Sequence, residues 1–292
     1  MRRAVNAAGL ALFAALGLLS LAPLALVVGD VLYRGLAAMW KLGPGFLTAL
    51  PPTPLDESGG VGPALAGTLY MTALGALAGF LLGFPIGVYI GEYRWELAAR
   101  LARVGVNVLV EFPTITIGLF VYSLSGLLTP ALRALPRPPP PLDLFVGPPS
   151  VFNAYAGAAA LALIMTPYVA LFTASAYASV AAGLREAVYS IAGDERRALF
   201  VAMRKVLSRV ITAAALLGTA KIAGETAPLL FTAGYSNYYG PFTRETASIP
   251  VLIYRSALAP YPIYHEVAYA AAALLLLLVL AAYALAQLAA KR

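Results

Sequence analysis

Six apolar stretches, each long enough to cross a lipid bilayer, constrain what this chain can fold into more than any other feature. A bilayer core about 30 Å thick needs roughly 20 apolar residues in a helix. The stretches lie at about 7–29, 64–90, 104–128, 152–177, 208–233 and 264–289. Because lipid satisfies no backbone polar group, each stretch must be helical. The sequence therefore predicts an all-α integral membrane protein with six transmembrane helices.

The charges along the chain indicate how these helices cross the membrane. The chain has 20 Lys and Arg and 13 Asp and Glu, a net charge of +7. Most of the basic residues fall in segments on the same side as the N-terminus, and basic loops stay in the cytoplasm. Both termini are therefore predicted to be cytoplasmic. This bias explains the basic charge without a nucleic-acid partner, because no RNA-binding motif accompanies it.

The first apolar stretch follows "MRR" and so resembles a secretory signal peptide. Its apolar core exceeds roughly 20 residues, and no small-x-small cleavage site precedes "GDVLYRG". We therefore expect a retained transmembrane helix and an extracytoplasmic segment over residues 1–63. Residues 64–292 are predicted to form the main transmembrane core.

Residue types that support enzymatic chemistry are scarce. The chain has no cysteine, which excludes disulfides, zinc-thiolate sites and thiol catalysis, and His265 is its one histidine. No Gly-x-x-x-x-Gly-Lys-Ser/Thr loop is present to hold nucleotide phosphates. We expect a protein that is not an enzyme, binds no cofactor or metal, and takes any energy it needs from another protein.

A lysine and a glutamate lie within the fifth apolar stretch. Lys221 and Glu225, in "KIAGETAPLLFTAG", are four residues apart, so a helix would place them on one face. An ionisable residue at membrane depth costs several kcal/mol unless it is paired or faces water, so it is a functional candidate. Two interpretations stay open, a pathway lining and an ion pair that locks two helices.

Prolines lie inside four of the stretches. Pro228, three residues after Glu225, is predicted to bend or open the fifth stretch. Pro85, Pro113 and Pro167 are similarly predicted to interrupt the second, third and fourth stretches. Bent helices around a shared centre suit a gated pathway. Kinks that serve packing alone are the alternative.

Further polar side chains are candidates for the same pathway. Glu111, beside "FPT", could approach the fifth helix, although a position near the inner interface would make it ordinary. Thr114 and Thr226 can donate hydroxyls to an anion, but such hydroxyls more often bond to backbone in membrane helices.

The connecting segments differ in kind. "GEYRWELAARLAR" has apolar residues at helical spacing and predicts an interfacial helix. The outer segments "LGPGFLTALPPTPLDESGGVGP" and "LPRPPPPLDLFVGPPS" are rich in Pro and Gly, so we expect extended or turning backbone there.

The long basic loop at about 178–209 predicts two short helices. The first carries an apolar stripe of Leu184, Ala187, Val188 and Ile191. Gly193 can end that helix, and Asp194 can cap the next. Such a corner either lies on the membrane surface or fits into a groove of a partner.

The same loop carries a family resemblance. "LREAVYSIAGDERRALFVAM" resembles the cytoplasmic EAA loop of ABC-transporter permeases, which docks into the ATPase subunit. By that resemblance the ATPase-coupling residues are Glu186, Ala187, Gly193, Asp194 and Arg197.

A more specific resemblance covers nearly all of residues 59–290. "GETAPLLFTAG" resembles the fifth membrane helix of the PstA-type phosphate transport permeases. Other segments match in the same order, namely "GGVGPALAGTLYMT", "FPIGVYIGEY", "EFPTITIGLFVY" and "SIPVLIYRSA". The resemblance implies the permease architecture of a type I ABC importer, which is MetI-like.

The resemblance also implies a function and partners. The chain would form half of the pathway of an ATP-driven phosphate importer in the plasma membrane of a prokaryote. Its partners would be a PstC-type permease subunit, ATPase subunits that use the ATP, an extracytoplasmic phosphate-binding protein and membrane lipid. Lys221 would supply positive charge to the anion, and Glu225 would hold that side chain or accept a proton. Family members usually carry Arg there, and lysine keeps the charge but loses bidentate geometry.

Other functions remain open from the residues alone. A permease for sulfate or molybdate would need the same charge. An ion-coupled secondary carrier would use Glu225 or Glu111 to carry protons without an ATPase, and a membrane scaffold would transport nothing.

Overall fold

The computed structural model describes residues 2–133 and 152–291, which are helical almost throughout and contain no strand. The longer helices are α1 (Arg2–Leu42), α2 (Gly62–Glu92), α3 (Leu97–Glu111), α4 (Thr114–Arg133), α5 (Ala154–Ala178), α6 (Ala182–Ala192), α9 (Ser208–Ala223), α11 (Ile249–Ala257) and α12 (Pro262–Lys291). The shorter elements are η1 (Pro44–Leu47), α7 (Glu195–Arg197), the π-helix η3 (Ala198–Met203), α8 (Arg204–Val206) and α10 (Ala227–Thr232).

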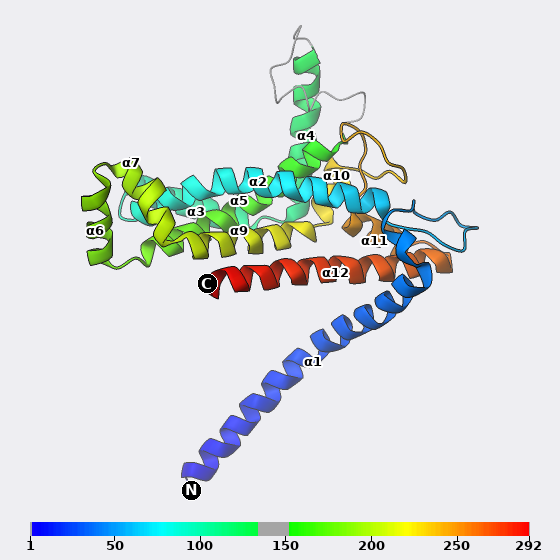
Figure 1. Cartoon of the computed structure of the whole chain (residues 1–292), viewed down its shortest axis with the longest axis horizontal. Coiled ribbons are helices and arrows are strands. Elements are labelled where there is room, and N and C mark those ends of the chain that lie inside the picture. The colour runs from blue at the N-terminus through cyan, green and yellow to red at the C-terminus, as the bar shows by residue number, and fades with distance from the viewer. Residues whose placement is uncertain (1, 134–151, 292) are drawn as a thin grey trace.

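The helices α2, α5, α9 and α12 run side by side as a bundle (Figure 1). The short helices α6 and α7 lie at one end, and α11 lies at the other. Four helices, α1, α2, α5 and α12, are long and apolar enough to cross a membrane alone. The described residues give up to six spans if two bent helix pairs each count as one. The prediction of an all-α, multi-pass membrane protein is therefore confirmed.

The tightest contact in the bundle is between α2 and α5. It rests on a glycine at every fourth position of α2, namely Gly75, Gly79, Gly83, Gly87 and Gly91. A Cβ atom at any of them would lie 2.5–2.8 Å from an atom of α5. Small residues let membrane helices approach closely, because packing rather than water exclusion holds them together. The two helices therefore behave as one packed pair.

The third predicted span, 104–128, is wrong as a single straight helix. Its residues are divided between α3 and α4, which meet at Phe112 and Pro113 with a bend of 101°. Proline has no N–H and disfavours a helical conformation in the residue before it, and Phe112 is extended, with ψ of 131°. The predicted interfacial helix after α2 is the first part of α3.

Pro85 and Pro167 do not divide their helices in two, and that they bend these helices stays a prediction. The helices α2 and α5 are continuous through them. Membrane helices tolerate an internal proline because neighbouring helices and side chains satisfy the freed backbone groups.

The N-terminal helix is longer than the sequence pattern predicts. It continues to Leu42, well past the expected end near residue 29, so much of the predicted extracytoplasmic segment is helical. The C-terminal part of α1 packs against α12, and its N-terminal part leaves the bundle (Figure 1). Residues 48–61 have the non-helical backbone that their prolines and glycines predict. The second Pro-rich segment, "LPRPPPPLDLFVGPPS", lies outside the described residues.

Candidate functional site

The fifth predicted span, 208–233, is interrupted beside its charged residues. The helix α9 ends at Ala223, and α10 begins at Ala227 with Pro228 in its first turn. A proline in the first turn of a helix loses no hydrogen bond, because that N–H would be unpaired anyway. Pro228 therefore starts a new helix. Of the two predicted outcomes, a bend or an opening of the helix, the structure shows the opening. We call residues 224–226 the α9–α10 break.

The structure pairs Lys221 with Glu225, although they do not share one helix. Lys221 lies in the last turn of α9 and Glu225 in the α9–α10 break, with 3.2 Å between Nζ and Oε1. The lysine side chain is 37% exposed in the isolated chain, and that of the glutamate is 14% exposed. The ammonium also lies 4.9 Å from the ring centroid of Tyr168 on α5. It is thus held between a carboxylate and an aromatic face, with one side open.

The helix α4 reaches the same region through a glycine. A Cβ atom at Gly118 would lie 2.7 Å from Cα of Pro228, so the two backbones touch. Thr226 lies in the break and Thr114 begins α4, and both are half-buried. Glu111, at the end of α3, is exposed and makes no ion pair within the described residues. The structure therefore brings Lys221 and Glu225 together and leaves Glu111 outside their pair.

The corner predicted in the long loop is confirmed. The helix α6 ends at Gly193, whose φ of 75° is left-handed and favours glycine. The side chain of Asp194 accepts a 2.8 Å hydrogen bond from the backbone N–H of Arg197, which caps α7. Glu186 and Ala187 are exposed on α6.

The apolar stripe on α6 is only partly buried. Val188 packs into the core, while Leu184 is 47% exposed and Ile191 is 86% exposed. Exposed large apolar side chains beside a capped corner suit contact with another surface. The stripe therefore has one side packed on the bundle and one side free in the isolated chain.

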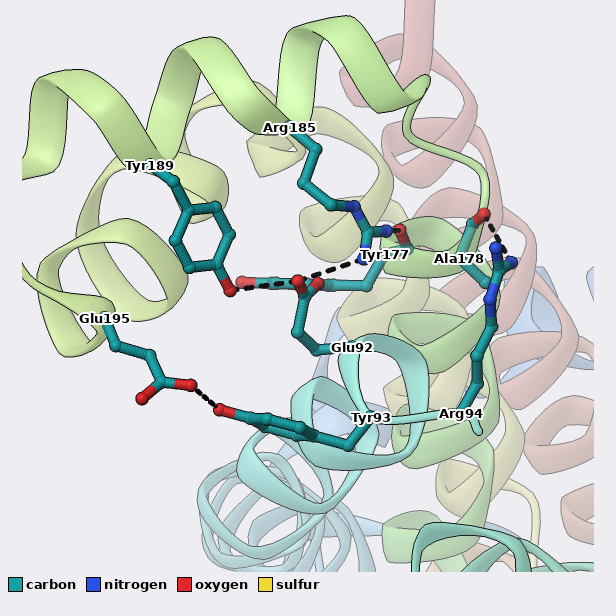
Figure 2. Close-up of polar contacts among 8 residues, drawn as sticks. All are labelled: Glu92, Tyr93, Arg94, Tyr177, Ala178, Arg185, Tyr189 and Glu195. Carbon is teal, nitrogen blue, oxygen red and sulfur yellow. Dashed lines mark hydrogen bonds and ion pairs between the residues drawn. The ribbon is translucent and has the colours of Figure 1, made fainter. Parts of the chain in front are cut away.

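Sequence reasoning missed a cluster of polar side chains that joins this corner to the bundle. In Figure 2, the carboxylate of Glu92 at the end of α2 meets two side chains of α6. Arg185 lies 3.0 Å from its Oε1, and the hydroxyl of Tyr189 donates to the same oxygen at 2.9 Å. The sequence does place Arg185 and Tyr189 on one face of the loop helix, because they are four residues apart. No sequence pattern connected them to an acid at the end of a distant helix.

The residue that follows α2 contacts the other side of the corner. The hydroxyl of Tyr93 donates to Glu195 of α7 (Figure 2). That hydrogen bond, together with burial, raises the pKa of Tyr93 to about 12. Burial and the contact with Glu92 also raise the pKa of Tyr189.

Comparison with solved structures identifies the class of fold. The chain resembles a MetNI methionine ABC transporter chain in an inward-facing conformation, with a TM-score of 0.55 and 16% identity. The match covers 78% of this chain and 92% of that one. The fold is thus that of an ABC-transporter permease with several membrane-spanning helices.

Curated sequences identify the family. The chain is 35% identical to the probable phosphate transport system permease protein PstA of Methanocaldococcus jannaschii, over 92% of this chain and 88% of that protein. It is 32% identical to PstA of Haemophilus influenzae over 80% of this chain and 76% of that protein, and 29% identical to PstA 1 of Mycobacterium tuberculosis over 89% and 79%. A scan against protein-family models found no match. The chain belongs to the PstA family of phosphate transport system permease proteins.

Proposed function

We propose that this chain forms half of the membrane pathway of an ATP-driven phosphate importer. The observation that carries the proposal is the 35% identity, over 92% of this chain, to a protein named as a probable phosphate transport permease. The ABC-permease fold and the membrane-spanning helices support it.

Lys221 is the residue that we assign to the anion. A phosphate ion that enters a membrane needs donors and positive charge to replace its water. Lys221 offers both, because Glu225 contacts it on one side and the remaining N–H groups are open on another. Glu225 holds the ammonium in place when no anion is bound. Thr226 and Thr114 are hydroxyl donors near the same path.

The energy comes from a partner in this proposal, since the chain has no phosphate-binding loop of its own. The corner at Gly193 and Asp194 is the surface for an ATPase subunit, with Glu186, Ala187 and Arg197 around it. That end of the bundle faces the cytoplasm, together with both termini, in the plasma membrane of a prokaryote. A PstC-type subunit completes the pathway, and a phosphate-binding protein delivers the anion outside.

Reconstitution tests this proposal. We expect vesicles that contain the chain, a PstC-type subunit, the ATPase and the binding protein to take up radioactive phosphate only with ATP, and to ignore sulfate and molybdate. Lys221→Met should lower uptake about 100-fold, the equivalent of roughly 3 kcal/mol of lost contact with a charged group. The matched control is Lys41→Met, because Lys41 also pairs with a glutamate, Glu266, at 2.7 Å, but on α1 and α12 and outside the α9–α10 break.

The other functions predict different results. Uptake of sulfate or molybdate in preference to phosphate would show a permease for another oxyanion. Uptake without the ATPase would show a secondary carrier. Glu186→Ala should weaken ATPase attachment, and unchanged attachment would reject the assignment of the corner.

A further inference from the structure

We propose that Glu92 is a positioning residue for transport, which fixes the coupling corner to the α2–α5 pair so that they move as one body. The proposal rests on the proposed function, because it assumes that the corner meets an ATPase. We call the residues that make this connection the end clamp, namely Glu92, Tyr93, Arg185, Tyr189 and Glu195.

The helix α6 needs such a connection because its link to the bundle is short and irregular. Only residues 179–181 join α5 to α6. Arg185 spans this link, since one nitrogen donates to the carbonyl of Tyr177 at 2.8 Å and another pairs with Glu92 at 3.0 Å (Figure 2). A cation beside the free carbonyls at a helix C-terminus is favourable. One side chain therefore ties α6 to the ends of both α5 and α2.

Glu92 is in an unfavourable place for a residue that serves stability alone. Its side chain is 7% exposed, and it lies at the C-terminus of α2, where the helix dipole disfavours negative charge. One carboxylate oxygen receives both Arg185 and Tyr189, while Oε2 is buried without a partner in the described part of the chain. Burying a charge is costly unless it is paired. A carboxylate kept here fits a role in holding α6.

Glu92, the last residue of α2, and Tyr93, the next residue in the chain, contact the two helices of the corner. Glu92 binds α6, before Gly193, and Tyr93 binds Glu195 of α7, after it (Figure 2). The corner therefore cannot pivot about Gly193 or the α5–α6 link without breaking one of these contacts. A push on the corner is passed to the end of α2.

The glycine contacts of α2 carry the displacement further. A Cβ atom at Gly91, next to Glu92, would lie 2.7 Å from the carbonyl oxygen of Ala174, so α2 cannot slide freely on α5. Tyr168 on α5 faces the ammonium of Lys221. The α2–α5 pair thus connects the end clamp to the charged residues at the α9–α10 break.

Glu92→Gln tests the proposal with little change in shape. The amide oxygen can still accept hydrogen bonds, but the charge that holds Arg185 is lost. In the reconstituted transporter we expect phosphate moved per ATP hydrolysed to fall about fivefold while the ATPase stays attached. Tyr189→Phe removes one hydrogen bond only and should give a smaller fall. The control is Glu96→Gln, because Glu96 is exposed and its side chain accepts one hydrogen bond within the described residues, from the hydroxyl of Tyr89 at 3.4 Å.

A second measurement does not depend on transport. Backbone amides of α6 should exchange hydrogen faster in Glu92→Gln than in the wild type or in Glu96→Gln, since α6 is released from α2. The double variant Glu92→Gln with Arg185→Gln should exchange no faster than Arg185→Gln alone, because the ion pair that Glu92→Gln removes is already lost there.

Three results would overturn the proposal. Unchanged transport per ATP or unchanged exchange in α6 would show that Glu92 does not hold the corner. If Glu92→Gln loses both ATPase attachment and thermal stability, the residue has a merely structural role. A wild-type transporter without ATP-dependent phosphate uptake would instead reject the proposed function, and the exchange data would still decide whether the clamp holds α6.

Discussion

The α2–α5 pair and the α9–α10 break each carry a glutamate paired with a basic side chain, but they hold it differently. Glu92 is nearly buried, and its pair with Arg185 is supported by Tyr189. Glu225 makes one contact with a lysine that is 37% exposed. The first pair is enclosed, while the second leaves the ammonium of Lys221 partly exposed.

The backbones around the two pairs differ in the same way. The helix α2 is continuous over 31 residues and meets α5 through regularly spaced glycines. The helix α9 stops at Ala223, and Pro228 starts a separate short helix. Close packing makes a region rigid, because no neighbouring atom can move without a clash. We therefore expect changes in the α2–α5 pair to affect folding, and changes at the break to affect transport.

The largest effect is expected from filling the α2–α5 contact. In Gly87→Val the new Cβ would lie 2.5 Å from the carbonyl oxygen of Ala170, which backbone cannot easily avoid. We expect a loss of at least about 3 kcal/mol in the free energy of unfolding, measured in detergent. Gly105→Val on α3 is the control, since nothing lies within 4 Å of that position. Equal stability of the two variants would show that the pair is not tightly packed.

A smaller effect on stability is expected at the break. Glu225→Gln should change the free energy of unfolding by less than about 1 kcal/mol, because partly exposed ion pairs contribute little. Phosphate uptake should fall roughly tenfold, since the ammonium of Lys221 is no longer held in place. Glu266→Gln breaks the pair with Lys41 between α12 and α1 and is the matched control. A large loss in the free energy of unfolding together with normal phosphate uptake would contradict this comparison.

The smallest effect concerns the end clamp at high pH. The pKa of Tyr93 is raised to about 12 by its hydrogen bond to Glu195, from 10.0 in an unperturbed tyrosine. The contact therefore stabilises the fold below pH 10 and is lost as the pH rises toward 12. We expect Tyr93→Phe to melt earlier than the wild type at pH 8, and the difference to vanish near pH 12. Tyr238→Phe, in an exposed loop, is the control, and a constant difference would contradict this assignment.

Part of this organisation could be predicted from the sequence because it depends on local chemistry. Apolar stretches of bilayer length predict the helices, and a Gly-Asp pair between two amphipathic segments predicts the corner at Gly193. The four-residue spacing of Lys221 and Glu225 predicts their contact, even though the helix ends between them. The roles of Lys221, Glu225 and the corner in transport stay predictions.

Other features depend on residues far apart in the chain. Neither the 101° bend between α3 and α4 nor the continuity of α2 through Pro85 follows from proline alone, because neighbouring helices decide whether the freed carbonyls are satisfied. The length of α1 likewise goes beyond its apolar run, since the C-terminal part of that helix packs on α12.

By itself the sequence determined an all-helical membrane protein and the position of its charged pair, since hydropathy and spacing act over a few residues, and its identity to relatives determined the family. Only the tertiary structure brought Glu92 to Arg185, a separation of 93 residues along the chain. It also placed Tyr168 beside Lys221. The first contact depends on the ends of α2 and α5 lying together, where Arg185 reaches both, and the second on the packing of α5 against α9.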